Sequence, residues 1–191
     1  MKKHRKKLKA MLVFVALIPL LAMFYGAFAN SLGPDPAKAL AHGTGEWALR
    51  FLLLTLVISP LRLLTGHAEW LAYRRALGLL SFSYALIHMV VFCLFLLELR
   101  WHALWTEILE RPYITVGFSA LILLLPLAIT STNGWQRKLG RRWRSLHQLV
   151  YPAAVLALVH LLWQARSDFT EAISYIVIFS LLMLCRFPQV K

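Results

Sequence analysis

Cysteine and acidic residues are scarce in this sequence. Its 191 residues include two cysteines, Cys93 and Cys185, and both fall in apolar stretches. There is no C-x-x-C-H motif, so the sequence indicates neither a disulfide framework nor covalent haem attachment. There is also no G-x-G-x-x-G motif, and few residues follow the last apolar stretch. We therefore expect no nicotinamide or flavin dehydrogenase domain in the chain, and a separate electron donor if the protein is a redox protein.

Apolar residues make up 60% of the sequence and give a mean hydropathy of +0.65. Soluble domains of this size are more polar, so the sequence indicates an integral membrane protein. None of its apolar spans alternates as membrane β-strands do, so the expected fold is all-α, a six-transmembrane-helix bundle forming a single domain over residues 1–191. No internal repeat is convincing, and the last span is short. The predicted spans are at about 10–29, 46–64, 77–97, 113–131, 145–164 and 172–186.

Local signals mark the ends of the first two spans. The first follows a basic stretch and ends in Ala27-Phe28-Ala29, which resembles a signal-peptide cleavage site. We expect no cleavage, because the apolar run of about twenty residues exceeds a usual signal core and five more spans follow. In the second span, helical geometry is disfavoured for the residue before a proline, so we expect its helix to end at Ser59–Pro60.

Positive charge is distributed unevenly between the predicted loops. The chain has 21 Lys and Arg against eight Asp and Glu, a net charge of +13. With the N-terminus in the cytoplasm, sixteen of the basic residues lie on the cytoplasmic side and five on the other, together with seven of the acidic residues. This asymmetry predicts that both termini are cytoplasmic, with the basic loops facing anionic membrane lipids rather than nucleic acid.

Three histidines lie at membrane depth. His88 is in the third span, whereas His147 and His160 are thirteen residues apart in the fifth. At about 1.5 Å per residue, His147 and His160 lie roughly 20 Å apart, near opposite membrane faces. The small residues Gly78, Ser81, Ser83 and Ala85 precede His88 and allow close approach of a helix or a flat cofactor. An intramembrane histidine is a functional candidate by default, although a single one can simply be hydrogen-bonded inside the bundle.

The spacing of these histidines favours one kind of chemistry. No partner acids are found in the predicted spans, which argues against a proton relay. A zinc site needs three or four ligands close together. Two imidazoles from two helices are the axial ligands of a six-coordinate b-type haem, and depth pairs His88 with His160. His147 has no histidine at its own depth in the third span, where Arg74 and Arg75 stand instead.

Arginines gather beside His147 in the stretch WQRKLGRRWR at 135–144. They are either lipid-facing charges or ligands for haem propionates or a flavin phosphate, because arginine binds such anions in a fork geometry. Arg74, Arg75, Arg141 and Arg144 are the candidates for cofactor binding.

The sequence resembles ferric-reductase-like transmembrane domains and, more closely, the MsrQ (YedZ) family. The pattern of two histidines in the fifth span and one in the third carries this resemblance. Four runs extend it over almost the whole chain: GPDPAK at 33–38 with the following His42, RRALGL at 74–79, RPYITVG at 111–117 and TSTNGWQRKLGRRWRSLHQLVY at 130–151.

The resemblance implies a membrane b-type cytochrome in the bacterial inner membrane. Such a subunit passes electrons from the quinone pool or a cytoplasmic flavin reductase to a periplasmic molybdopterin methionine sulfoxide reductase of the MsrP type, which repairs oxidised proteins. It implies one haem b, or two, together with FMN. His88, His147 and His160 match the family's histidines. Because the inner third-span histidine of the related oxidases is missing, His147 is either a ligand with an unknown partner or part of an inner flavin site.

Two other functions remain open from the sequence. A stand-alone metalloreductase would need metal-binding groups on the outer side, where only Asp35, His42, His102 and Glu107 are available. A haem-free membrane anchor subunit would leave three intramembrane imidazoles without a role. If the chain is instead a haem subunit of an oxidoreductase system, we expect it to be the electron-transfer subunit rather than the catalytic one. We expect a partner to dock on the outer loops at 35–42, 101–111 and 166–171.

Overall fold

Helices account for all the regular structure in the described part of the chain, residues 2–165 and 167–186 of a computed structural model. Side chains are described from Lys7 onward. The charge count also includes basic residues that lie outside the described part, namely those before Lys7 together with Arg166 and Lys191. The long helices are α1 (Lys2–Phe28), α2 (Pro36–Thr65), α3 (Leu71–Val91), α5 (Pro112–Ile129), α8 (Val150–Gln164) and α9 (Thr170–Leu184). Short elements are η1 (Ala68–Trp70), the π-helical turn η2 (Phe92–Leu96), α4 (Trp101–Glu110), α6 (Asn133–Leu139), α7 (Arg141–Leu146) and η3 (His147–Leu149).

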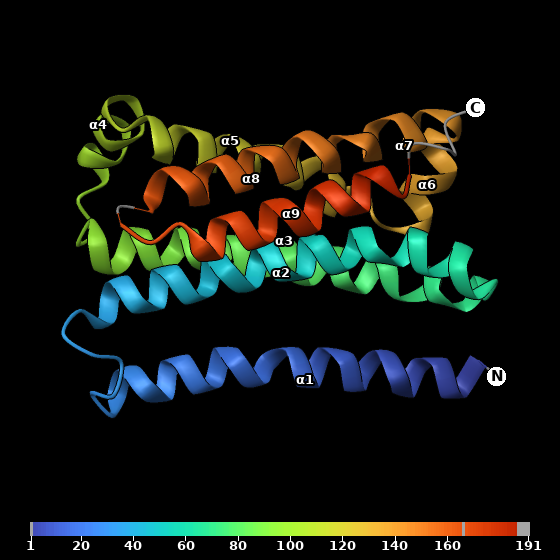
Figure 1. Ribbon diagram of the computed structural model, residues 1–191, viewed down its shortest axis with the longest axis horizontal. Coiled ribbons are helices and arrows are strands. Elements are labelled where there is room, and N and C mark those ends of the chain that lie inside the picture. The colour runs from blue at the N-terminus through green and yellow to red at the C-terminus, as the bar shows by residue number, and fades with distance from the viewer. Residues whose placement is uncertain (1, 166, 187–191) are drawn as a thin grey trace.

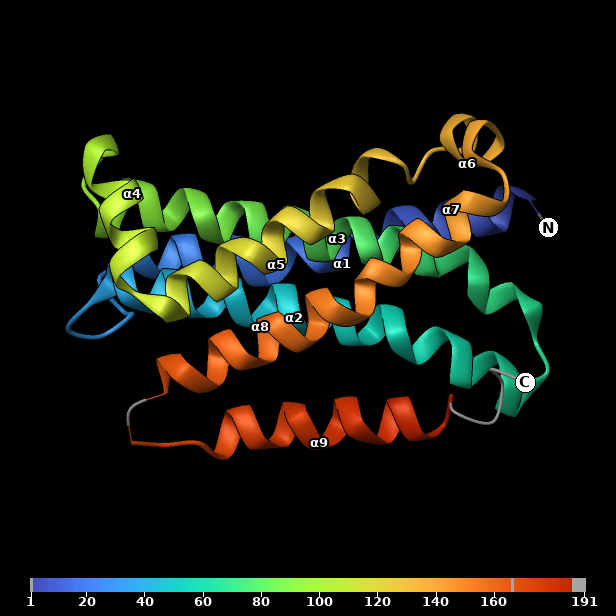
Figure 2. The ribbon, with the colours of Figure 1, turned by 90° about the horizontal axis from the view of Figure 1, so that it is seen from above.

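The long helices run side by side along one axis (Figures 1 and 2). One end of the bundle, here called the α4 end, holds α4 and the connections from α1 to α2 and from α8 to α9. The opposite end, here called the terminal end, holds the start of α1, the end of α9, and helices α6 and α7. Each of the long helices therefore connects the two ends.

Five helical segments in the described residues are long and apolar enough to cross a membrane. They are Lys7–Phe28, Pro36–Thr65, Ala68–Leu96, Pro112–Ile129 and Arg141–Gln164. A sixth apolar helix, Thr170–Leu184, is shorter, as the sequence predicted for the last span. The helical class of the fold is confirmed, and the protein is a multi-pass membrane protein.

The second span begins earlier than predicted, and its helix does not stop at the proline. Helix α2 begins at Pro36, where the Asp35 side chain accepts a hydrogen bond from the Lys38 backbone N–H at 3.0 Å. It continues through Pro60 to Thr65 and ends at Gly66, whose φ of 70° caps the helix. The prediction of an end at Ser59–Pro60 is therefore wrong. Pro60 is buried, and packing around a membrane helix can keep the helix intact past a proline.

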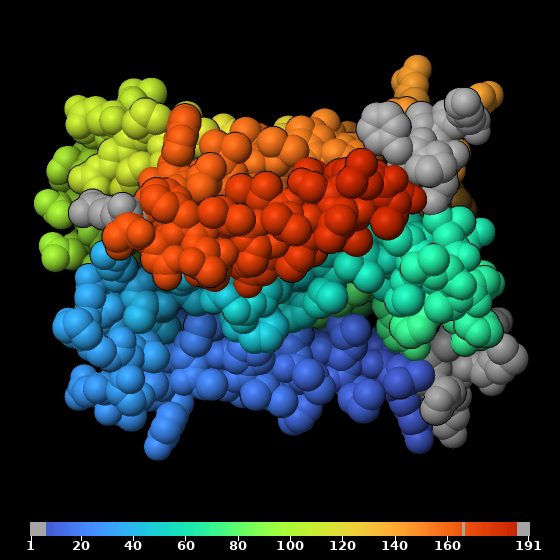
Figure 3. All heavy atoms as spheres, viewed as in Figure 1, coloured from blue at the N-terminus to red at the C-terminus, as the bar shows by residue number. Residues whose placement is uncertain are grey.

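Helix α2 is the central element of the bundle. Its apolar side chains form one core cluster with residues of α5 and α8, namely Leu49, Leu52, Leu53, Leu56, Leu124, Val150, Ala153, Ala154 and Leu158. The space-filling view shows α9 covering α2 and α8 on one face, with α1 running along the edge (Figure 3). Helix α1 packs less deeply, through Ala16, whose carbonyl accepts a hydrogen bond from the Tyr84 hydroxyl. A four-helix group of α2, α3, α5 and α8 thus surrounds the interior.

Candidate functional site

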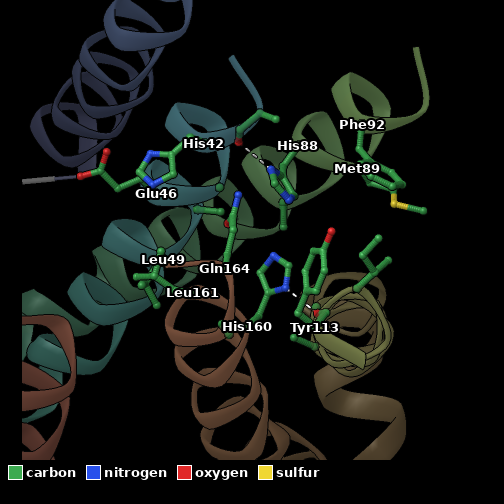
Figure 4. Close-up of a pocket in the computed structure, with 18 of the residues that line it drawn as sticks. His42, Glu46, Leu49, His88, Met89, Phe92, Tyr113, His160, Leu161 and Gln164 are labelled. Atoms are coloured by element: carbon green, nitrogen blue, oxygen red, sulfur yellow. Dashed lines mark hydrogen bonds between the residues drawn. The ribbon is translucent and has the colours of Figure 1, made fainter. Parts of the chain in front are cut away.

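A cavity of about 640 Å³ lies between α2, α3, α5 and α8 on the side of the α4 end. Its volume is within the range of ligand and cofactor sites. Most of its wall is apolar, and Figure 4 shows His88 and His160 pointing into it from α3 and α8. Ser81 and Ala85, two of the small residues noted before His88, also line the cavity. The close approach predicted for this part of the third span is therefore present.

The structure brings His88 and His160 together across the cavity. Their ring centres are 6.1 Å apart, and their planes are nearly perpendicular at 76°. Each ring is fixed by a backbone carbonyl: Nδ1 of His88 is 2.7 Å from the Ala41 oxygen, and Nδ1 of His160 is 2.6 Å from the Tyr113 oxygen. A carbonyl only accepts hydrogen bonds, so Nδ1 carries the proton in both rings. Each Nε2 is left with a lone pair for a ligand.

Two helical glycines make room for these rings. A Cβ on Gly45 would lie 3.0 Å from Nδ1 of His88, and a Cβ on Gly117 would lie 2.7 Å from Nδ1 of His160. A Cβ atom essentially never lies closer than 3.0 Å to another heavy atom, and a Cβ contact at 3.0 Å is already tighter than most. Glycine at 45 and 117 therefore permits each imidazole to lie against the backbone that accepts its hydrogen bond.

The two histidine sites are built in the same way. The residue whose carbonyl accepts the bond precedes its histidine by 47 residues in both cases, and each glycine follows that acceptor by four positions. The α2–α3 and α5–α8 pairs are thus two copies of one arrangement. No internal repeat is convincing in the sequence because this correspondence lies in the spacing of a few residues and not in a longer run of identities. Under this repeat Arg75 occupies the position that corresponds to His147.

This donor set fits a six-coordinate haem. Two imidazole nitrogens bound at about 2 Å on opposite sides of one metal place the ring centres roughly 6 Å apart, which agrees with the separation of His88 and His160. Neutral nitrogen donors from two helices and an apolar slot between them are the other requirements for b-type haem.

Acidic residues lie nearer to the cavity than the sequence predicted. Glu46 is inside α2 and lines the cavity, where it accepts hydrogen bonds from Arg50 and, at 2.9 Å, from the Tyr175 hydroxyl. Arg50 in turn donates to the Tyr175 oxygen at 2.8 Å. His42 lines the same cavity and lies 3.5 Å from the Glu171 carboxylate. The expectation that the spans hold no partner acid fails at Glu46, which stands at the predicted start of the second span and lies inside the longer helix α2.

His147 lies apart from the cavity, towards the terminal end. Its Nε2 is 3.1 Å from the Thr130 hydroxyl, and its ring stacks on Trp143 with 4.0 Å between centres. The Thr130 hydroxyl donates its one proton to the Pro126 carbonyl at 2.6 Å, so it accepts from His147. Nε2 of His147 is therefore a hydrogen-bond donor in this arrangement and does not present a lone pair.

The candidate arginines also lie towards the terminal end. Arg75 donates to Asn133 at 2.8 Å, and Arg74 is close enough to His147 to interact with it electrostatically. Arg141 and Arg144 are exposed on α7. None of the four is among the described residues that line the His88–His160 cavity.

Sequence reasoning missed the residues that position the two imidazoles. Ala41, Gly45 and Gly117 have no functional side chain, Tyr113 acts through its backbone carbonyl, and Gln164 was not considered as a lining residue. The equal separation of Gly45 from His88 and of Gly117 from His160 is the one signal in the sequence that identifies this set.

The fold and the paired histidines define a multi-pass helical membrane protein with a two-imidazole cofactor cavity. Residues 44–158 match the family described as the ferric reductase like transmembrane component. A protein-methionine-sulfoxide reductase heme-binding subunit MsrQ of Xanthomonas oryzae pv. oryzae is 49% identical over 154 residues, 81% of this chain and 71% of that protein. The corresponding MsrQ of Brucella anthropi is 47% identical over 176 residues, 92% of this chain and 80% of that protein. The chain belongs to the ferric-reductase-like transmembrane family and, within it, to the MsrQ family.

Proposed function

We propose that this protein is a b-type haem subunit that carries electrons through the membrane to a methionine sulfoxide reductase. The relatives named above are heme-binding subunits of protein-methionine-sulfoxide reductase, and they cover most of the chain. The observation that carries the proposal is the pairing of His88 and His160, whose ring centres are 6.1 Å apart and whose Nδ1 atoms are both bound to carbonyls, which leaves both Nε2 atoms free for a ligand. An anchor without haem has no use for this arrangement.

A bound haem supplies one-electron oxidation and reduction at its iron. His88 and His160 would hold that iron through Nε2, while the Ala41 and Tyr113 carbonyls keep the rings in place. Hydrogen bonds of this kind orient ligand histidines and raise their basicity. The apolar wall around them excludes water, which limits the reorganisation that accompanies a change of charge at the iron.

The residues near the terminal end support a second, inner cofactor site. His147 donates from Nε2 to Thr130, and this favours its place beside a flavin over a role as an iron ligand. Arg74, Arg75, Arg141 and Arg144 would bind the phosphate of FMN in this reading, because guanidinium groups recognise phosphate. One haem b is then the expected content, and a second haem would require His147 to exchange its Thr130 bond for iron.

The charge distribution supports a defined orientation in the bacterial inner membrane. With both termini in the cytoplasm, the terminal end with its arginines faces the cytoplasm and the α4 end faces the periplasm. Residues 1–191 would then form one transmembrane haem-binding domain, with its haem in the periplasmic half of the bilayer. This places the haem near a periplasmic acceptor and leaves the inner site to a cytoplasmic flavin reductase or the quinone pool.

The partner reductase, expected to be a molybdopterin enzyme of the MsrP type, would dock at the α4 end. Loops there carry acidic residues, including Glu107 and Glu110 on α4 and Asp168 before α9. Hydrogen bonds from Thr170 hold the pKa of Asp168 below its ordinary value, so this carboxylate is ionised at neutral pH. Electron-transfer partners use small, charged interfaces of this kind.

A visible spectrum and a reoxidation assay test the proposal together. The purified protein should give a reduced-minus-oxidised spectrum with the α-band of a low-spin b-type haem. Addition of oxidised MsrP-type reductase with methionine sulfoxide should reoxidise the dithionite-reduced haem. A purified, folded protein without an α-band would show that it is an anchor, and reoxidation by ferric ions but not by the reductase would favour the metalloreductase.

A further inference from the structure

The wall of the histidine cavity changes from apolar to polar towards the α4 end. Its deep part is lined by residues such as Leu49, Leu52 and Leu124, whereas its outer part is lined by charged and amide side chains. These polar residues are Asp35, Lys38, His42, Glu46, Arg111 and Gln164. A second cavity of about 130 Å³ adjoins the first and shares Lys38, His42, Leu161 and Gln164 with it. The histidine cavity therefore has one polar end.

Most charged groups at this end already have partners. Asp35 accepts from the Lys38 backbone, Glu46 from Arg50 and Tyr175, and Asp168 from the Thr170 backbone. Glu171 pairs with His42 at 3.5 Å, and Arg111 with Glu107 at 2.7 Å. Within the described residues, the Lys38 ammonium and the Gln164 amide make no hydrogen bond or ion pair. A cation and an N–H donor are thus available at the mouth of the cavity.

Both groups are placed one or two helical turns beyond the imidazoles. Gln164 follows His160 by one turn of α8, and Figure 4 shows its side chain in the space between His42, His88 and His160. Lys38 precedes Gly45 by seven residues of α2, which is about 10 Å along the helix axis. This separation is comparable with the reach of a haem propionate from the iron.

We propose that Lys38 and Gln164 bind the haem propionates, so that the haem lies with its carboxylate edge towards the α4 end. This inference rests on the proposed function. An ionised carboxylate is costly in an apolar slot unless cations and N–H groups receive it, and the polar mouth is the part of this cavity that offers them. The arginines at 137–144 are at the opposite end of the bundle and do not line the cavity, so they do not hold the propionates of this haem.

The rate of haem loss tests the assignment. Holoprotein in detergent is mixed with excess apomyoglobin, and transfer of haem is followed for the wild type, Lys38→Met, Gln164→Leu and the double variant. Each single substitution should accelerate haem loss about tenfold, as expected for one hydrogen bond to a charged group. Arg137→Gln with Arg142→Gln, two exposed arginines at the terminal end that have no assigned cofactor role, is the matched control, and it should leave the rate unchanged.

Haem dimethyl ester, whose propionates are uncharged, separates propionate binding from a general loosening of the cavity. Protein reconstituted with this ester should release it at the same rate in the wild type and in Lys38→Met. The midpoint potential of Lys38→Met with haem b should also fall, because a cation near the ring disfavours the ferric state.

Three results would overturn the inference. In the first, haem loss from Lys38→Met and Gln164→Leu equals that of the wild type while their bis-histidine spectrum is intact. In the second, the arginine double variant loses haem faster, which would place the propionates at the terminal end. In the third, Lys38→Met accelerates release of the dimethyl ester by the same factor as release of haem b, which would indicate a structural effect. A wild-type protein without haem would instead overturn the proposed function itself.

Discussion

A Cβ atom on Gly117 would lie 2.7 Å from Nδ1 and 2.8 Å from Cε1 of His160, so the imidazole rests directly against the backbone of α5. The hydrogen bond to Tyr113 holds the ring in that position. His160 therefore depends on the absence of a side chain at a residue 43 positions earlier. The same relationship, slightly looser at 3.0 Å, joins Gly45 to His88.

Alanine at Gly117 should displace His160 from its position. Gly117→Ala is expected to lose most of the low-spin haem spectrum, because the ring must move to accept a methyl group at 2.7 Å. Gly45→Ala should show a smaller loss, since its contact is 3.0 Å. Haem content per protein, measured by the pyridine haemochrome assay, gives the comparison.

Gly78→Ala is the control for these glycine variants, because its Cβ would meet Thr55 at an ordinary 3.8 Å. It should retain haem and be as stable as the wild type or slightly more so, since alanine favours the helix. Equal haem loss in all three variants would show that the effect comes from helix packing in general and not from the histidine contacts.

Ring orientation gives a spectroscopic prediction. The planes of His88 and His160 are 76° apart, and both are fixed by hydrogen bonds at Nδ1. Nearly perpendicular axial imidazoles give ferric low-spin haem a strongly anisotropic electron paramagnetic resonance signal, whereas parallel ones give an ordinary rhombic signal. A rhombic spectrum from the purified ferric protein would mean that the rings reorient on binding or that other ligands hold the iron.

The sequence predicted the class of fold and the pairing of His88 with His160, and each prediction had a physical basis. Hydropathy identifies membrane helices because each must bury its backbone polar groups internally. Depth along a helix follows from the rise per residue, so residue counts sufficed to match the two histidines. Hydropathy and helical depth can both be calculated from position along the chain alone.

The parts that the sequence did not predict depend on side-by-side packing. Gly45 and Gly117 matter because a histidine ring from the facing helix lies against their backbone. No local sequence pattern specifies which helices face each other. Helix α2 begins well before its predicted start and passes Pro60 because its tertiary contacts stabilise a helix that is longer than its apolar core. The sequence left two roles open for His147. Its hydrogen bond to Thr130, which bears on that choice, depends on how the connection between α5 and α8 folds.

Acidic residues at the α4 end should govern the reaction with the partner reductase. Reversal of Glu107, Glu110 and Asp168 to lysine is expected to slow reoxidation of the reduced haem about tenfold at low salt, because steering between charged surfaces is lost. Stopped-flow absorbance measures this rate, and the haem spectrum should be unchanged.

The control for this surface is Glu69→Lys in η1, between α2 and α3 at the terminal end, which should leave reoxidation as fast as in the wild type. Raising the ionic strength should bring the wild-type rate towards that of the triple variant, since salt screens exposed charges. Rates that are independent of both salt and charge reversal would place the electron exit elsewhere.

Orientation in the membrane can be tested with single cysteines. Cys93 is buried and Cys185 exposed, so both are first replaced by serine. A membrane-impermeant maleimide added to intact spheroplasts should then label Thr106→Cys on α4 but not Gly134→Cys on α6. Labelling of Gly134→Cys alone would invert the orientation proposed from the charge distribution.

The most direct measurement is the reduced-minus-oxidised visible spectrum of the purified wild type beside His88→Ala, His160→Ala and His147→Ala, each normalised to folded protein. If His88 and His160 are the two axial ligands of one haem, either of their alanine variants loses the low-spin α-band, while His147→Ala retains it. A full α-band in His88→Ala or His160→Ala, or its loss in His147→Ala alone, would contradict the pairing on which this account rests.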